Sequence, residues 1–384
     1  LRLEFVAVIT LIASYLLLMT LLRAALDAKG FRDLIIPVLF YALGQGFGSI
    51  KRGDKVLKIL IVLVLAIGFF ELLAVDTFSR VFNIFSYYVN QGGLAGAINY
   101  TEGTLAVNGL RPEGIGRTIL PSLLGAHRVS SLFLEPVSLG NFATIVAAWG
   151  LSKDRSELKA MMFYLVCAAI MITLCDSRYG SIALLFLIAM RVLLRGRARN
   201  VVIIMPFVTM IFLLGLALFQ SKVTGDNVSG RLFITGQVLA NFGAGEMMGL
   251  KSFDINYGDM GYANVLTKFG MILCIALWLG FWLIRMSDER GNRFRAYVAV
   301  YASLILTVSG TSFFALKTAG VLWFLVGCCA AHRSIMTDPV VSAGTAPGSG
   351  KPSGVPGDVD VARSPASTRA APGSRPASSP PFNS

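Results

Sequence analysis

The sequence predicts an all-α protein, a polytopic integral membrane helix bundle of about ten transmembrane helices with a disordered C-terminal tail. Three observations predict this fold class. Hydrophobic residues make up 55% of the 384 residues and charged residues only 14%, whereas a soluble domain carries roughly 25% charged residues. Many apolar runs approach the length of about 20 residues that a helix needs to cross a bilayer. Short basic segments separate these runs, as is typical of cytoplasmic loops.

The apolar runs give ten candidate spans in chain order. They cover residues 3–22, 34–50, 59–75, 130–150, 160–176, 180–195, 201–219, 261–284, 296–313 and 318–333. The first run is too long and too uninterrupted for the core of a signal peptide, so it is predicted to span the membrane. The second is short and rich in glycine, and its Gly44 and Gly48 form a small-xxx-small pair that predicts close helix packing.

Every second connection between these spans is basic. Lysine and arginine recur in the connections at 51–58, 153–159, 191–199 and 285–295. Basic loops stay on the cytoplasmic side, and these four connections share one side when ten spans alternate. The number of spans and their orientation therefore support each other. The first connection, 23–33, is near neutral and bears little on the orientation.

The opposite side then carries two long polar loops, at about 76–129 and 220–260. Loops carry function more often than the scaffold that holds them. Both belong to a transmembrane domain that covers 1–337. The remaining segment, 338–384, is rich in Pro, Ser, Ala and Gly, so it buries too little apolar surface to offset its ordering entropy. We expect it to be a disordered cytoplasmic tail.

The charge and the cysteines exclude several classes of site. The net charge is +13, but the basic residues lie mostly between the apolar runs, so nucleic acid is not an expected partner. The five cysteines lie in or at the ends of apolar runs, and His127 and His332 have no ligand-like spacing with them. We therefore expect no disulfide framework, no metal site and no cofactor.

Ionisable residues collect near the predicted outer ends of the spans. A charge at membrane depth costs about 3 kcal/mol, so it is usually paired or lines a wet cavity. One such residue is equally well explained by snorkelling to the lipid headgroups, whereas a cluster on one face favours a shared polar cavity. The residues concerned are Glu71, Asp76, Arg128, Glu135, Asp176 and Arg178, with Lys268 deeper in the eighth span.

Four short motifs follow one another on this outer face. Segment 128–142 holds an arginine, a Glu-Pro pair and a Gly-x-Phe step, and 176–181 holds a Ser-Arg turn. Segment 229–231 ends in an arginine, and 259–270 reads Asp-x-Gly-Tyr followed by Phe-Gly. In type and order the four motifs resemble those of bacterial O-antigen and exopolysaccharide polymerases.

The resemblance implies a multi-pass glycosyltransferase of the bacterial inner membrane with its active face in the periplasm. Such enzymes join oligosaccharide repeat units carried on undecaprenyl diphosphate into a surface polysaccharide. The implied partners are the lipid-linked oligosaccharide, membrane lipid and a chain-length regulator protein. The leaving group is a lipid diphosphate, and a guanidinium can grip phosphate oxygens in bidentate fashion. The candidates for this task are Arg231, Arg178 and Arg128, in that order.

The acceptor in such a reaction is a sugar hydroxyl, which benefits from a general base. Glu135 and Asp259 are the candidates, because partial burial makes a carboxylate a better base. Tyr257 and Tyr262 are candidates for binding the sugar. The sequence has neither a nucleotide-binding motif nor a metal constellation, so the predicted reaction is metal-independent.

The sequence leaves alternatives open for each residue and for the function. Arg178 could pair with Asp176, Arg231 could be a solvated loop residue, and Glu135 could simply cap a helix. The tyrosines could be interfacial aromatics. The alternative functions are an O-antigen ligase that transfers a finished glycan and a lipid-linked oligosaccharide flippase. Ligases place a histidine where this chain has Asp259, and transporters usually show inverted repeats, which are not evident here.

Overall fold

A computed structural model describes residues 3–84, 117–193, 196–219, 228–251, 257, 260–310 and 312–331, with the backbone alone at 196–199. Three predicted features lie outside these residues. They are the candidate base Asp259, most of the first outer loop, and the C-terminal tail.

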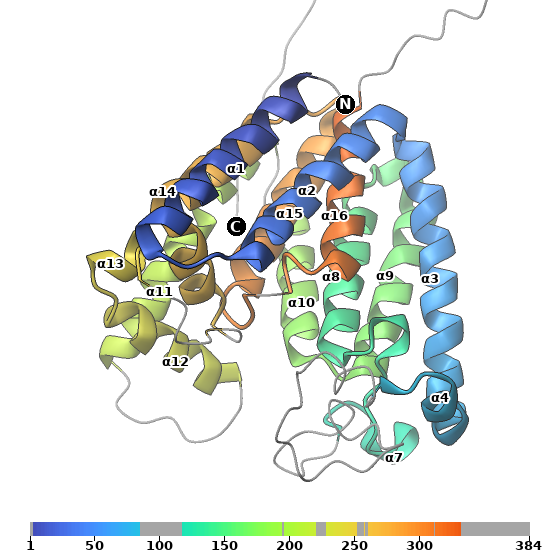
Figure 1. The fold of residues 1–384 in the computed structure, drawn as a ribbon. Helices are drawn as coiled ribbons and strands as arrows, with labels where there is room; N and C mark the ends of the chain where they lie inside the picture. Colours follow the sequence, from blue (N-terminus) through green and yellow to red (C-terminus); the bar gives the residue numbers. More distant parts are fainter. Residues whose placement is uncertain are drawn as a thin grey trace, which may run out of the picture. The chain divides into compact units, whose positions relative to one another are not determined.

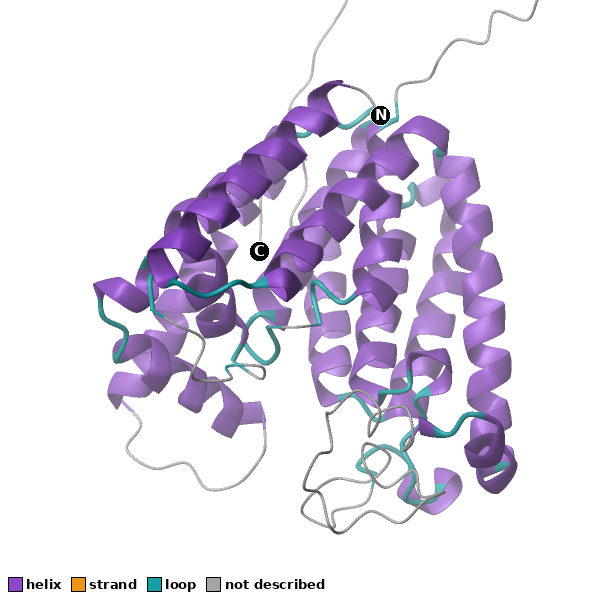
Figure 2. Cartoon of the chain, viewed as in Figure 1, coloured by secondary structure: helices purple, strands orange, loops and turns teal. Residues whose placement is uncertain are grey.

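The described residues form helices, turns and loops, and no strand occurs among them (Figure 2). Each of the ten predicted spans has a helical counterpart, shown in chain order in Figure 1. These helices are α1 (Leu3–Arg23), α2 (Ala28–Phe47), α3 (Ile50–Leu73), α8 (Pro136–Ser152), α9 (Leu158–Cys175), α10 (Arg178–Leu193), α11 (Met205–Phe219), α14 (Gly261–Leu283), α15 (Glu289–Ile305) and α16 (Leu316–Ala330).

Shorter helices occupy the connections. The α-helical ones are α4 (Val75–Val81), α7 (Pro121–Leu124), α12 (Val228–Ala240) and α13 (Ala244–Met247). The 3-10 segments are η1 (Ser131–Phe133), η2 (Arg155–Glu157) and η3 (Gly196–Ile204). Two ends of the bundle follow from this order. At the loop end, α3 and α9 finish and α8, α10 and α16 begin; at the basic end, α8 finishes and α3, α9 and α15 begin.

Five helical segments are long and apolar enough to cross a membrane. They are Leu3–Arg23, Ile50–Leu73, Arg155–Cys175, Asn200–Phe219 and Gly261–Leu283. Large apolar side chains are exposed on them, including Leu21, Val62 and Phe212, as expected where the surrounding solvent is lipid. The chain is therefore a helical membrane protein, and the full number of ten spans stays a prediction.

Some helix boundaries differ from the predicted ones. Helix α8 starts at Pro136, six positions after the predicted start at 130, because Leu134 takes a left-handed conformation and Glu135 is extended. Proline is well suited to the first helical position, since it lacks the N–H that would be unpaired there. Helix α15 begins at Glu289, seven positions before the predicted start at 296, and the Asp288 carboxylate caps it by accepting from Gly291 N at 2.7 Å.

Helix α8 lies at the centre of the bundle. All its residues from 138 to 152 are buried, and it packs against α9, α10 and α15. A second close contact joins α2 to α16. A Cβ atom on Gly44 would lie 2.2 Å from the Phe324 carbonyl oxygen, and one on Gly327 would lie 2.3 Å from that of Tyr41. The prediction that Gly44 serves close helix packing is thus confirmed.

Helix α14 is broken at Gly270, where φ is 73° and ψ is 152°. Two backbone carbonyls beside the break accept hydrogen bonds from α1. Tyr15 Oη donates to the Phe269 carbonyl at 2.8 Å, and Arg23 Nη2 donates to the Lys268 carbonyl at 2.9 Å. Helix α1 therefore holds the break in place, since an unpaired backbone group inside a membrane protein is costly.

Replacement of Gly270 by alanine is expected to lower the free energy of unfolding by about 2 kcal/mol, because this combination of φ and ψ is essentially restricted to glycine and costs other residues about 1–3 kcal/mol. The added Cβ would also lie 2.6 Å from the Met248 carbonyl oxygen. Gly280→Ala is the control, because that position of the same helix has no neighbouring atom within 4 Å of its Cβ. Thermal unfolding in detergent measures both. Equal melting temperatures for the two variants would show that the backbone conformation at Gly270 does not require glycine.

A polar hub joins the helices at the basic end. The Asp54 carboxylate accepts hydrogen bonds from Trp149 Nε1 at 2.7 Å, Tyr164 Oη at 3.0 Å, Lys153 Nζ at 3.1 Å and Arg290 Nη2 at 3.1 Å. The Arg290 guanidinium also stacks over the Trp149 ring at 4.6 Å. The hub thus connects α3, α8, α9 and α15 at the end opposite to the candidate functional site.

Candidate functional site

At the loop end, the segment before α8 is anchored by Glu71 in the last turn of α3. The Glu71 carboxylate is fully buried. It accepts hydrogen bonds from Ser130 N at 3.0 Å, Ser131 N at 2.5 Å and Ser130 Oγ at 3.0 Å, and it lies 2.8 Å from His127 Nε2. These contacts replace the water that a buried carboxylate loses, so they hold residues 127–131 against α3.

Asp176, in the turn between α9 and α10, holds a second segment. Its carboxylate is buried and accepts from Thr118 N at 3.0 Å, Thr118 Oγ1 at 2.8 Å and Ile119 N at 2.8 Å. Arg117 donates to the carbonyls of His127 at 2.8 Å and Leu174 at 2.9 Å. Burial lowers the pKa of the Arg117 guanidinium below its ordinary value, and the Asp176 charge partly offsets this shift.

The Asp176 contacts bear directly on Arg178. Residue 178 opens α10, and its guanidinium makes no hydrogen bond or ion pair within the part of the chain that the structure describes. The Asp176 carboxylate binds Thr118 and Ile119 instead, so the turn pair between Asp176 and Arg178 is not formed. Arg178 is therefore a half-buried cation at the loop end that has no partner among the described residues.

Arg128 lies beside the same turn. Its Nε donates to the Cys175 carbonyl at 3.2 Å. Helix α8 reaches this turn as well, because a Cβ atom on Gly140 would lie only 2.4 Å from Ser177 Oγ. The glycine of the Gly-x-Phe motif thus lets α8 approach the Ser-Arg turn closely. Arg128, Arg178 and the start of α8 are brought together around the turn at 176–177.

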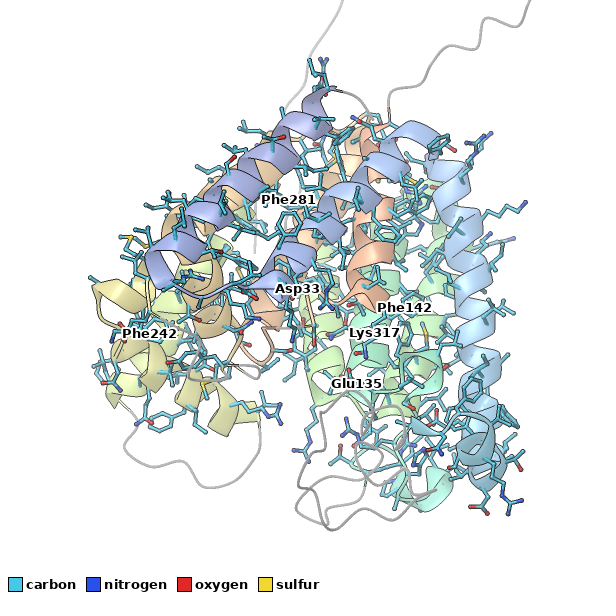
Figure 3. The ribbon with its side chains drawn as sticks, viewed as in Figure 1. Asp33, Glu135, Phe142, Phe242, Phe281 and Lys317 are labelled. Carbon is cyan, nitrogen blue, oxygen red and sulfur yellow. The ribbon has the colours of Figure 1, made fainter. Side chains whose placement is uncertain are left out.

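Glu135 forms an ion pair at the start of α8. It occupies the N-cap position, but its carboxylate makes no capping bond to the backbone. Its Oε2 instead accepts from Ser138 Oγ at 2.8 Å and from Lys317 Nζ at 2.7 Å. Figure 3 shows Glu135 and Lys317 close together. The side chains are 36% and 33% exposed, respectively, so the pair is accessible at the surface. Simple helix capping does not account for Glu135.

Lys317 was not among the site residues predicted from the sequence. Its ammonium also donates to the Phe133 carbonyl at 2.9 Å, and thereby ties the start of α16 to η1. One signal was present, since Lys317 immediately precedes the tenth apolar run at 318–333. Its partner, however, is 182 positions away in the chain.

Arg231, Tyr257 and Tyr262 belong to a second group around α12 and the start of α14. Arg231 was predicted in a loop, but it lies half-buried in the first turn of the 13-residue helix α12. One turn later, Thr235 Oγ1 lies 3.1 Å from the Thr307 carbonyl oxygen, which joins α12 to the end of α15.

The two tyrosines differ in their surroundings. Tyr262 is buried, and its hydroxyl donates to the Ser303 carbonyl at 3.0 Å. It packs as part of the core, so we leave it out of the proposed site. Tyr257 is half-buried, with its ring edge-on to Phe242 at 5.8 Å between centroids.

Two apolar hollows lie elsewhere on the bundle. One, of about 350 Å³, is lined by Phe5, Leu39, Phe47 and neighbouring residues, and the other, of about 430 Å³, by Phe212, Gly215, Leu216 and Phe219. Neither includes a candidate residue. A scan against protein-family models, a search of curated proteins and a search of solved structures each found no match to this chain. The residues of the loop end are therefore the basis for assigning a function.

Proposed function

We propose that this protein is a membrane glycosyltransferase that polymerises undecaprenyl-diphosphate-linked oligosaccharide repeat units into a surface polysaccharide. One observation carries the proposal. Arg128 and Arg178 gather around the turn at 176–177, at the end of the bundle where Glu135 and Lys317 form an accessible ion pair. Two arginines and a lysine suit a lipid diphosphate, and a carboxylate suits a sugar hydroxyl.

The reaction makes specific demands that these residues meet. The acceptor hydroxyl attacks the anomeric carbon of the donor, and the bond from that carbon to the diphosphate oxygen breaks. Negative charge then develops on the departing diphosphate. Fixed cations stabilise such a charge more strongly in the transition state than in the ground state. We assign this role to Arg128 and Arg178, and a second, resemblance-based contribution to Arg231. Tyr257 and Asp259 stay candidates for contacts to the sugar and its hydroxyl.

We also propose that ten helices span the bacterial inner membrane, with the loop end in the periplasm and the C-terminus in the cytoplasm. Two observations support this arrangement. The predicted basic connections coincide with one end of the bundle, and positive loops favour the cytoplasmic side. The candidate residues Arg128, Glu135 and Arg178 all lie at the opposite end, where a lipid-linked repeat unit is presented in the outer leaflet.

A polymerase is favoured over a flippase by the distribution of charge. A flippase passes a polar glycan through the bundle, and secondary transporters usually bind near the midplane between repeated halves. Here the candidate residues Arg128, Glu135 and Arg178 lie at the loop end, and the Asp54 hub joins four helices at the basic end. This arrangement suits a reaction at one surface.

The test is reconstitution. Purified protein in lipid vesicles is supplied with undecaprenyl-diphosphate-linked repeat units from the same cell, and the products are separated on a gel beside a heat-inactivated control. We expect a ladder of lengthening chains. A single transfer to another acceptor would replace this proposal with a ligase. Movement of the intact lipid-linked unit across the vesicle membrane, without new glycosidic bonds, would replace it with a flippase.

A further inference from the structure

A histidine and a buried carboxylate meet at the loop end. His127 Nε2 lies 2.8 Å from Glu71 Oε1, and the two residues are 56 positions apart in the sequence. The Glu71 side chain is 0% exposed and the His127 side chain is 19% exposed. The pair therefore has one member fixed in the protein interior and one member that reaches the surface.

Glu71 does not need the histidine as a hydrogen-bond donor. Both of its oxygens already accept from Ser130 N, and Ser131 N and Ser130 Oγ add further bonds. These contacts alone satisfy a buried carboxylate. The imidazole adds one more contact to this set. The carboxylate therefore orients the imidazole, and the imidazole is not needed to hold the carboxylate.

The contact also determines which ring nitrogen carries the proton. A carboxylate accepts hydrogen bonds, so in the neutral imidazole the hydrogen lies on Nε2 and the lone pair lies on Nδ1. Among the residues that the structure describes, Nδ1 has no hydrogen-bond partner. The arrangement thus offers a basic nitrogen of fixed orientation at the loop end. Carboxylates orient catalytic histidines in the same way in other enzymes.

The chain places this histidine directly before a residue of the proposed diphosphate-binding group. His127 immediately precedes Arg128, and the two side chains contact different helices, α3 and α9. Arg117 fixes the His127 carbonyl, and Val129 N donates to the Leu174 carbonyl at 3.0 Å. By contrast, the carboxylate of Glu135 already accepts hydrogen bonds from Ser138 and Lys317 through Oε2.

We infer that His127 is the general base of the proposed polymerisation and that Glu71 is its positioning residue. This inference rests on the proposed function. The hydroxyl oxygen of the acceptor sugar forms a bond to the anomeric carbon of the donor. The hydroxyl proton passes to Nδ1 of His127. The electron pair of the broken bond stays on the lipid diphosphate, which leaves beside Arg128 and Arg178. Solvent then removes the proton from the imidazolium, which Glu71 has stabilised.

The test uses the reconstituted full-length protein and the ladder assay. His127→Ala is expected to slow polymerisation about 100-fold, within the range for loss of a general base. Imidazole added to the buffer should restore part of the rate, because it can occupy the space and accept the proton. His127→Gln can still donate to Glu71 but cannot act as a base, so it should be as slow as the alanine variant. In the double variant Glu71→Gln/His127→Ala, imidazole should restore less, because its orientation is lost.

His332→Gln is the matched control, since it makes the same substitution at the other histidine and should polymerise at the wild-type rate. Three outcomes would overturn the inference and leave the polymerase intact. They are a wild-type rate in His127→Ala, a wild-type rate in His127→Gln, or a slow His127→Ala variant that imidazole fails to improve. Absence of a ladder from the wild-type protein would instead reject the proposed function itself.

Discussion

Replacement of Arg178 by alanine is expected to slow polymerisation by about 10²–10³-fold, which corresponds to about 3–4 kcal/mol of lost transition-state stabilisation. The guanidinium opens α10 and has no partner in the described part of the protein, so its removal leaves no buried charge unpaired and the fold should persist. The rate of ladder formation at saturating donor is the measurement, at matched folded yield.

Two further variants define the role of Arg178. Arg178→Lys retains the charge but loses the bidentate geometry, so its rate should fall between those of the wild type and the alanine variant. Arg80→Ala is the matched control, because Arg80 is also at the loop end, exposed on α4. We expect it to polymerise at the wild-type rate. Equal rates for Arg178→Ala and Arg80→Ala would remove Arg178 from the site.

Replacement of Asp54 by alanine is expected to lower the free energy of unfolding by about 3–5 kcal/mol, the usual cost of removing one partner from a buried ion pair. The side chains of Arg290 and Lys153 are 6% and 2% exposed. Without Asp54 they would keep their charge in the interior with fewer partners, and Trp149 and Tyr164 would each lose an acceptor. Unfolding in a denaturing detergent, followed by tryptophan fluorescence, measures the change.

Glu157→Ala provides the control for the hub. Glu157 pairs with the same Lys153 at 3.1 Å, but its side chain is 40% exposed. An exposed pair contributes about 0.2–1 kcal/mol, so this variant should be nearly as stable as the wild type. Similar losses in Asp54→Ala and Glu157→Ala would show that the hub acts as an ordinary surface ion pair.

The helices were largely predictable because membrane insertion depends on local composition. A run of apolar residues such as 3–22 or 261–284 identifies its own helix, and the structure has both, as Leu3–Arg23 and Gly261–Leu283. Helix boundaries were predicted less well where the backbone conformation of the preceding residues determines the first helical residue. The start of α8 depends on the conformations of Leu134 and Glu135, which hydropathy does not record.

The sequence predicted which residues belong to the candidate site, but not which of them contact one another. The sequence singled out Glu71, Arg128, Glu135, Asp176 and Arg178 because charge near a membrane span is costly. The sequence left open whether Asp176 pairs with Arg178. In the structure, the Asp176 carboxylate accepts hydrogen bonds from the backbone N–H groups of Thr118 and Ile119. The sequence also indicated no role for His127, because the partner of that histidine lies on another helix.

By itself, the sequence determined that this chain is a helical membrane protein with basic connections on one side and polar, arginine-bearing segments on the other. The hydropathy and the charge of a segment depend only on its own residues, so both properties can be evaluated directly from the sequence. Only the tertiary structure decided the pairing of Glu135 with Lys317, of His127 with Glu71, and of Asp54 with Arg290. Those partners are 182, 56 and 236 positions apart, and a hydrogen bond depends on distance in space, which is set by how the helices pack.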